Sequence, residues 1–261
     1  MPEGGSRAGP SLGPPADPTS GLESLAESLA ELSRDLRDEP YEAALERLVH
    51  RGASELVGAR WASVSLLHGG ILRTIARTEP RAEAIDRVQY DLGTGPCVDA
   101  VLEDSVYVSG DVTKDPVWLS LGKRLHAEFG VRSMLAFRLN LLDRSDALAG
   151  LNLSSDRADA FSPDDVHRGM VLATHCALLV TAGLAQRRAG ELLEALERNR
   201  EIGVAVGVLM GRHGLTREGA LDLLRIASQR TNRELAEIAV EVADTGLPPQ
   251  GSWLDLPRSP P

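Results

Sequence analysis

The sequence predicts an α+β protein with an N-terminal antiparallel sheet and helices, a long linking helix and a C-terminal bundle of three helices. Residues 61–66 change to a period of two, as a strand does, and the strands that follow predict two hairpins, over 61–77 and 133–154. Apolar residues at helical spacing continue without a proline or polar loop from about 164 to 210. Three amphipathic helical segments then lie between 191 and 246, the first of them continuing the long helix.

The composition is that of an ordinary soluble protein. The 261 residues are 43% hydrophobic and 25% charged, which is enough for one large or two modest domains. A net charge of −10 argues against a protein that holds nucleic acid mainly through its overall field. The two cysteines, Cys97 and Cys176, exclude a disulfide framework and suit a reducing compartment. No apolar run approaches the roughly 20 residues that span a bilayer, and no signal pattern is found, so we expect a cytoplasmic protein without a membrane segment.

The N-terminal two-thirds of the chain predicts the sheet. Residues 1–20 and 247–261 are rich in proline, glycine and serine and are predicted to be disordered. The predicted elements between them are helices over 22–36 and 41–57, strands over 61–66 and 71–77 joined by a turn at 68–70, a strand over 106–109, a helix over 117–129, and strands over 133–142 and 148–154. The region 78–105 predicts no element. This order indicates an antiparallel sheet with helices mainly on one face, an architecture that can hold small ligands between sheet and loops.

The C-terminal segment predicts three helices through its end signals. The first is expected to end at Gly214, and the second to begin at Thr216, whose hydroxyl can accept from the free amides of the first turn. The third is expected to begin with Asn232 as its N-cap and to end at Gly246. Helices this short do not persist alone in water, so they must pack on one another.

The run ERNREIGVAVGVLMGRHGLTREGALDLLRIASQRTNRELAEIAVEV resembles the ANTAR domain, the three-helix output module of bacterial antitermination regulators. The resemblance covers residues 191–246. It implies binding to RNA hairpins in a nascent leader transcript, which prevents a terminator from forming, and close packing at the small residues Gly203, Ala205 and Gly207. The sequence departs from the family pattern at Val206, where lysine is often found, and at Leu221, where an aromatic residue is common. The implied RNA-binding face consists of Asn199, Arg200, Arg225, Ser228, Asn232 and Arg233.

Residues 187–246 contain nine arginines, no lysine and ten acidic residues, so RNA binding requires the arginines to gather on one face. Arg200 and Arg225 can neutralise phosphate or stack on unpaired bases, and the polar side chains of the face can read base edges. The alternative is structural: Arg200 pairs with an acid such as Glu197, and Asn232 caps the third helix.

Four segments of the N-terminal part resemble a GAF domain over about residues 40–185. They are DLGTGPCVDA at 91–100, GDVTKDPVW at 110–118, GVRSMLAFRL at 130–139 and GLNLSSDRADAFSPDD at 150–165. A GAF domain followed directly by ANTAR is a recurring arrangement in actinobacterial-type regulators. We therefore expect a GAF-like sensor domain over 21–186 and an ANTAR domain over 187–246.

The GAF resemblance places a ligand pocket where the loops and the central strand converge. The implied pocket residues are Asp111, Asp115, Trp118, Arg132 and Ser133, and the alternative is that the aspartates form turns while the indole closes the core. Cys97 is a sixth candidate, as a redox thiol or a ligand-contacting group, although a lone cysteine more often packs as a small hydrophobe. The histidines and cysteines lack metal-ligand spacing, and no phosphate loop or catalytic triad order is present. We therefore expect no metal, no cofactor and no enzymatic activity.

The helix that joins the two domains carries a heptad pattern. The apolar residues Leu178, Ala182, Ala185, Ala189, Leu192 and Leu196 recur at alternating steps of four and three. Continuing the pattern places Asn199 at the next core position, where a buried asparagine would fix the register of a parallel pair. The pattern predicts a homodimer through a coiled coil. The alternative is that the stripe packs on the sheet of its own chain.

These expectations describe an RNA-binding antitermination regulator whose GAF domain senses a small ligand or signal and controls ANTAR binding to paired leader hairpins, as a shift between populated states. Two other classes remain open. The last two helices could bind DNA as a helix-turn-helix, which the net acidity disfavours. The N-terminal domain could be a thiol-dependent GAF-fold reductase, for which Cys97 has no resolving cysteine nearby in the sequence.

Overall fold

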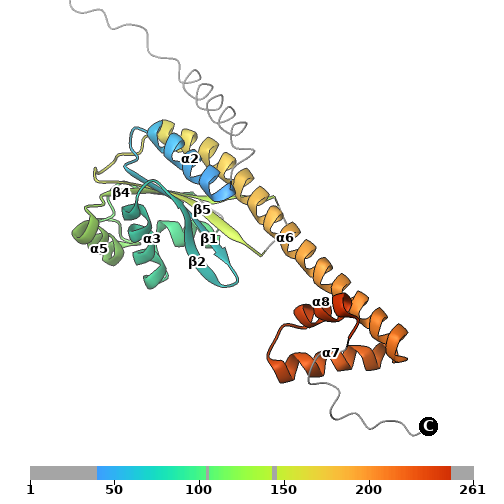
Figure 1. Cartoon of the computed structure of the whole chain (residues 1–261). Coiled ribbons are helices and arrows are strands. Elements are labelled where there is room, and N and C mark those ends of the chain that lie inside the picture. The colour runs from blue at the N-terminus through green and yellow to red at the C-terminus, as the bar shows by residue number, and fades with distance from the viewer. Residues whose placement is uncertain (1–39, 104–105, 143–145, 248–261) are drawn as a thin grey trace, which may run out of the picture. The chain divides into compact units, whose positions relative to one another are not determined.

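The computed structural model describes residues 40–103, 106–142 and 146–247 (Figure 1). The chain divides into two compact units, Met1–Leu184 and Ala185–Pro261, and each is described by itself. The predicted helix over 22–36 lies outside the described residues. So do the predicted disordered segments 1–20 and 247–261, apart from Leu247.

The N-terminal unit is built on a five-stranded antiparallel sheet of order β2-β1-β5-β4-β3, which confirms the α+β class. The strands are β1 (Trp61–His68), β2 (Ile71–Arg77), β3 (Val106–Ser109), β4 (Ser133–Leu139) and β5 (Leu148–Ser155). The predicted hairpin of β1 and β2 is confirmed. Its turn places Gly69 and Gly70 at φ 60° and 78°, a backbone conformation that glycine adopts at little steric cost. The strand predicted over 133–142 ends at Leu139 instead, and the Leu142 amide donates to the Thr181 hydroxyl at 3.1 Å.

Helices cover both faces of this sheet, so the prediction of helices mainly on one face was wrong (Figure 1). Helix α2 (Tyr41–Ser54) and the first part of α6 (Pro163–His213) pack on one face. Helices α3 (Pro80–Leu92), α4 (Pro96–Glu103) and α5 (Leu119–Phe129) belong to the other. With both faces covered, the first six residues of β1 are all buried rather than alternating between core and solvent.

Two of these helices, α3 and α4, occupy the region 78–105 for which the sequence predicted no element. The end signals of α3 are present, because Pro80 stands in its first turn and Gly93 adopts the left-handed C-cap conformation. Its buried face, however, includes Asp86 and Gln89. Polar residues at core positions weaken the apolar repeat from which a helix is predicted.

The C-terminal unit contains the end of α6, α7 (Arg217–Thr231) and α8 (Leu235–Thr245). The stripes of the three helices share one core, which includes Ala205, Leu209, Leu224 and Ile238, and this confirms the predicted three-helix bundle. Thr216 caps α7 as predicted, since its hydroxyl accepts from the Gly219 amide at 3.1 Å.

The prediction that Asn232 is the N-cap of the third helix was wrong. Asn232 has φ 51° and ψ 36° and stands at the C-cap of α7, while α8 begins three residues later with Glu234 as its N-cap. Asparagine serves both positions, because its short side chain supports an N-cap and also tolerates the left-handed conformation. The sequence therefore left the two choices indistinguishable.

Among the described residues, one helix passes a test of length and composition for crossing a membrane. A window of α6 has a mean hydropathy of 1.5, and 44% of it is buried inside the protein. This corrects the expectation that no apolar run approaches that length. The core helix of a folded domain passes the same test, and Leu172, Cys176, Val180 and Leu184 of α6 lie in the core of the N-terminal unit.

Candidate functional site

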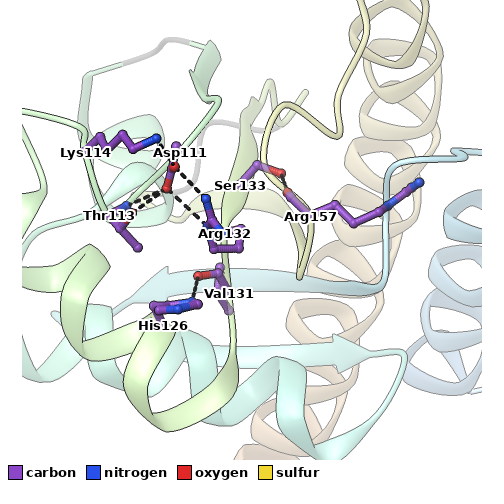
Figure 2. Close-up of polar contacts among 8 residues, drawn as sticks. All are labelled: Asp111, Thr113, Lys114, His126, Val131, Arg132, Ser133 and Arg157. Atoms are coloured by element: carbon purple, nitrogen blue, oxygen red, sulfur yellow. Dashed lines mark hydrogen bonds and ion pairs between the residues drawn. The ribbon is translucent and has the colours of Figure 1, made fainter.

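An ion pair between Asp111 and Arg132 organises the loop that follows β3 (Figure 2). Arg132 Nη2 lies 2.8 Å from Asp111 Oδ2, and its Nε donates to Oδ1 at 3.4 Å. The same carboxylate accepts from the Thr113 hydroxyl at 2.6 Å and the Thr113 amide at 3.1 Å, and Lys114 Nζ lies 3.3 Å away. The hydrogen bond from Arg132, followed by that from Thr113, holds the pKa of Asp111 below its ordinary value. The carboxylate is thus fully engaged by its own chain.

This ion pair leads to an expected acid dependence. Because the folded-state pKa of Asp111 lies below its unfolded value of 3.8, the pair contributes stability that is present above that pH and is lost as the pH falls below it. We expect Asp111→Asn to be less stable than the wild type at neutral pH and to lose less stability between about pH 5 and pH 3. Urea unfolding across that range measures both effects. Equal pH dependence in the two proteins would contradict the assignment.

The other predicted pocket residues near this loop are also hydrogen-bonded to groups of their own chain. Ser133 Oγ donates to the carbonyl of Arg157 at 2.7 Å (Figure 2), and Asp115 accepts from the Ser109 hydroxyl at 2.8 Å. Trp118 is buried in the core on the α5 side of the sheet, where its indole N–H donates to Asp99 at 2.6 Å. The structure therefore brings Asp111 and Arg132 together in a loop framework. It places Cys97 in different surroundings.

Cys97 belongs to a buried polar cluster between the sheet and helices α3 and α4. Its amide donates to Gln89 Oε1 at 3.0 Å, and its sulfur lies 3.3 Å from Ser65 Oγ. Asn152 Nδ2 donates to Ser65 Oγ at 2.8 Å and to Asp86 Oδ1 at 3.2 Å. The buried polar cluster is defined here as Ser63, Ser65, Thr74, Asp86, Gln89, Tyr90, Cys97 and Asn152.

Burial dominates the electrostatics of this cluster. It raises the pKa of Asp86 from 3.8 to about 7, against four lowering hydrogen bonds from Ser63, Thr74, Tyr90 and Asn152. Burial and then the charge of Asp86 raise the pKa of the Tyr90 hydroxyl and of the Cys97 thiol above their ordinary values. Since the thiolate is the reactive form of cysteine, Cys97 is held in its unreactive state.

Two buried polar atoms of the cluster have no hydrogen-bond partner among the described residues, the amide nitrogen of Gln89 and the amide oxygen of Asn152. One is a donor and the other an acceptor, and leaving both unpaired costs free energy that a small polar molecule could recover. The cluster is therefore the candidate ligand site of this unit. The sequence analysis missed Asp86 and Asn152, although an asparagine inside the apolar strand sequence GLNLSS was a usable signal.

In the C-terminal unit, three predicted RNA-binding residues lie on α7 or at its end. Arg225 and Ser228 are three residues apart and therefore share a helix face, and Asn232 follows at the C-cap. Ser228 Oγ donates to the Arg233 carbonyl at 2.7 Å and so fixes the turn into α8. Asn199 lies near this turn, because it lines a surface hollow of about 310 Å³ together with Glu234 and Leu235.

The predicted arginines differ in their partners. Arg233 lies 2.7 Å from Glu241 and 3.6 Å from Glu237, so acids neutralise it from two sides. Arg225 has an exposed ion pair with Asp222 at 3.3 Å, a kind of pair worth little in water. Arg200 is exposed, and no ion pair with it is found in the described part of the chain.

Acidic residues gather beside the hollow that Asn199 lines. A second hollow of about 390 Å³ is lined by Glu194, Glu197, Glu201 and Glu237, and it shares Arg198 and Ala236 with the first. These carboxylates disfavour a polyanion at the second hollow. The positions that depart from the ANTAR pattern lie inward: Val206 is buried and Leu221 packs partly against the core of the bundle.

The predicted heptad stripe of α6 is exposed within a single chain. Leu178, Leu192 and Leu196 are 48%, 62% and 55% exposed, and the alanines of the stripe and Asn199 are exposed as well. The residues of α6 that pack in the core of the N-terminal unit are others, such as Cys176 and Val180. Leu178 lines a hollow with Phe137 and Arg138 of β4, whereas the exposed residues from Ala182 to Leu196 give no support to packing on the sheet of the same chain.

Two family models match the chain in succession. A GAF domain model matches residues 39–181, more than half of the chain, and an ANTAR domain model matches residues 190–242. No curated protein matches the chain.

Several solved structures resemble the N-terminal part. A GAF sensor protein from Burkholderia vietnamiensis is 17% identical with a TM-score of 0.48, and covers 67% of this chain and 97% of its own. The free methionine-R-sulfoxide reductase of Neisseria meningitidis is 17% identical with a TM-score of 0.46, covering 65% and 91%. The GAF domain of a Coxiella burnetii phosphotransferase is 17% identical with a TM-score of 0.47, covering 66% and 98%. Similarity at this level carries no inference about ligand or activity.

Proposed function

Because the chain belongs to the GAF domain family and continues into an ANTAR domain, we propose that it is a signal-responsive regulator of transcription antitermination. The chain combines a sensor domain with an RNA-binding output domain, and this succession is the observation that carries the proposal. In the proposed function, a small ligand or signal acts on the GAF domain and controls the binding of the ANTAR domain to hairpin loops of an mRNA leader. We take 21–186 and 187–246 as the limits of the two domains.

The ligand acts at the buried polar cluster in this proposal. The unpaired atoms of Gln89 and Asn152 support the assignment, because they offer one donor and one acceptor in a buried site. Asp111, Asp115, Trp118, Arg132 and Ser133 then shape the loops beside the site rather than contact the ligand, since each already has a partner in its own chain. Cys97 stays a protonated thiol, so it takes part in the site through packing and not through charge.

The proposed RNA-binding face joins Asn199 and Arg200 of α6 to Arg225, Ser228, Asn232 and Arg233 at α7 and the turn that follows it. Arg200 and Arg225 supply the positive charge, because neither is held by a buried acid. Arg233 has a lesser share, since Glu237 and Glu241 already neutralise it. Asn232 can contact a base or phosphate while it ends α7.

The protein acts as a cytoplasmic homodimer in this proposal, paired through the exposed stripe of α6. An exposed row of leucines and alanines at alternating steps of three and four is the pattern of a coiled-coil seam. Placing Asn199 at the last position of the seam conflicts with its use in RNA binding. We propose that the seam ends at Leu196, which leaves Asn199 available to RNA.

The rival functions have less support. The DNA-binding alternative is a helix-turn-helix of the last two helices, and the ANTAR model that matches residues 190–242 favours RNA as the ligand of this bundle. A thiol-dependent reductase needs an accessible thiolate, and Cys97 is fully buried with a raised pKa. We therefore propose a regulator without catalytic activity.

The experiment that tests the function is sequencing of the RNA that copurifies with the full-length protein, followed by gel shifts. We expect enrichment of transcripts that carry two hairpins upstream of a terminator, and tighter binding to those hairpins than to duplex DNA of equal length. Equal or tighter binding to duplex DNA would reject antitermination in favour of the helix-turn-helix reading.

A further inference from the structure

The buried polar cluster contains a carboxyl group whose charge nothing nearby balances. Asp86 is 1% exposed, and within the described residues it has no ion pair. Hydroxyl and amide groups surround it instead: Thr74 Oγ1 donates to Oδ2 at 2.8 Å and Asn152 Nδ2 donates to Oδ1 at 3.2 Å. A carboxylate buried without a cation is disfavoured unless it takes up a proton.

Strands β1, β2 and β5 and helices α3 and α4 contribute the polar groups around Asp86. Strand β1 contributes Ser63 and Ser65, β2 contributes Thr74, β5 contributes Asn152 and α4 contributes Cys97. Helix α3 itself contributes Gln89 and Tyr90. Of these groups only Tyr90 and Cys97 can ionise, and burial keeps both protonated at neutral pH. Asp86 is therefore the one group of the cluster that changes charge near neutral pH.

The cluster has a hydrogen-bond arrangement for each state of Asp86. The carboxylate only accepts, which matches the donors that Thr74 and Asn152 present to it. A protonated Asp86 must donate once, and Asn152 Oδ1 is a buried acceptor without a partner. Rotating the Asn152 side-chain amide by 180° exchanges the positions of Oδ1 and Nδ2. Oδ1 would then accept from protonated Asp86 and from the hydroxyls of Ser63 and Ser65, which now accept from Nδ2.

We propose that the interior of the GAF domain is a proton-responsive element, in which uptake of one proton by Asp86 reverses the Asn152 amide and reorders the contacts between α3 and the sheet. This inference rests on the proposed sensor function of that domain, since the element occupies the proposed ligand site. Protons thereby regulate which arrangement of donors and acceptors a ligand meets.

The direction of the pH effect follows from the linkage between proton binding and folding. The pKa of Asp86 is about 7 in the folded protein and 3.8 in the unfolded chain. Between these two pH values the folded state therefore holds a proton that the unfolded state lacks. Stability therefore falls as the pH rises through this window and is constant above it. The unfolding equilibrium constant is expected to rise up to about tenfold per pH unit.

The test compares the full-length wild type with Asp86→Asn and with Asp91→Asn, which changes an exposed aspartate of the same helix. Urea unfolding between about pH 5 and pH 8 is followed by tryptophan fluorescence, because Trp61 and Trp118 are both buried in the GAF domain. We expect the pH dependence to persist in Asp91→Asn and to disappear in Asp86→Asn. An unchanged pH dependence in Asp86→Asn overturns the proposal.

A second measurement needs only wild-type protein, in case Asp86→Asn does not fold. Carbon NMR of aspartate-labelled protein follows the Asp86 carboxyl, and nitrogen NMR follows the Asn152 side-chain amide. We expect both signals to titrate with one shared midpoint close to pH 7. An Asp86 carboxyl that stays ionised from pH 5 to pH 8, or an Asn152 amide that does not respond, overturns the proposal. Neither measurement uses RNA, so failure here leaves the antitermination proposal intact, and failure of RNA binding leaves this one intact.

Discussion

Replacing Arg200 and Arg225 together by alanine is expected to weaken hairpin binding strongly while leaving the proposed dimer intact. Both side chains are exposed, and neither is held in the core of the bundle, so the fold should survive their loss. Removing two phosphate contacts is expected to weaken RNA binding by about one to two orders of magnitude at moderate salt and to lower the slope of log K against log salt by about 1.5. Gel shifts at several salt concentrations measure the affinity and the slope.

Arg233→Ala is the matched control for this pair. Like Arg225→Ala, it removes one positive charge from the bundle. Arg233, however, is already paired with Glu237 and Glu241. We expect a several-fold smaller loss of affinity than for Arg225→Ala alone. If the double variant binds hairpins as the wild type does, or if Arg233→Ala proves the most damaging, the RNA contacts lie on another face than the one proposed.

Replacing Leu192 and Leu196 together by glutamate is expected to turn the proposed dimer into a monomer. Both residues are more than half exposed in the single chain, so the change costs the monomer little stability. In a coiled coil they would be buried against the partner, and each leucine is worth about 1.5–3 kcal/mol on full burial. Four leucines per dimer would be lost and like charges would face each other, so the dissociation constant is expected to rise by about 100-fold or more. Sedimentation at micromolar concentration measures the change.

The neighbouring residue gives a closely matched control. Leu193 is 62% exposed, as Leu192 is, but it lies outside the heptad seam. Leu193→Glu should therefore leave the dimer intact. A dimer that survives Leu192→Glu with Leu196→Glu, or that Leu193→Glu disrupts equally, would place the interface elsewhere.

The proposed dimer bears directly on RNA recognition. Two linked ANTAR domains can engage two hairpins of one leader, and the second contact then benefits from a high effective concentration. The monomeric variant is expected to bind single hairpins with unchanged affinity and paired hairpins more weakly than the wild type. This difference separates loss of pairing from damage to the RNA-binding face.

The elements predicted best are those whose signals are local. Thr216 caps α7 because a hydroxyl at that position can reach the amide three residues on, and the turn of the first hairpin follows from two consecutive glycines. The continuity of α6 follows from the absence of any residue that would end it. Asn232 shows the limit of local signals, because the same side chain suits the end of one helix and the start of another.

The candidate sites were less accessible to sequence reasoning. The GAF resemblance pointed to the loops around Asp111 and Arg132, where the structure finds a self-satisfied ion pair. The cluster around Asp86 and Asn152 is assembled from residues up to 89 positions apart in the chain. Buried polar residues interrupt the apolar repeat from which a helix or strand is predicted. The polar side chains that form this cluster are therefore also the reason why α3 was not predicted.

The sequence by itself determined the α+β class, the order of a GAF-like and an ANTAR-like domain, the long helix between them and its heptad stripe, because periodicity, end signals and family motifs all act over short stretches. Only the tertiary structure decided that helices cover both faces of the sheet and that Asp86, Tyr90, Cys97 and Asn152 meet in one buried cluster. It also decided that Arg233 is neutralised while Arg200 stays exposed. Burial and charge pairing arise between segments distant in the chain, and they set the pKa of a carboxyl and the availability of a guanidinium.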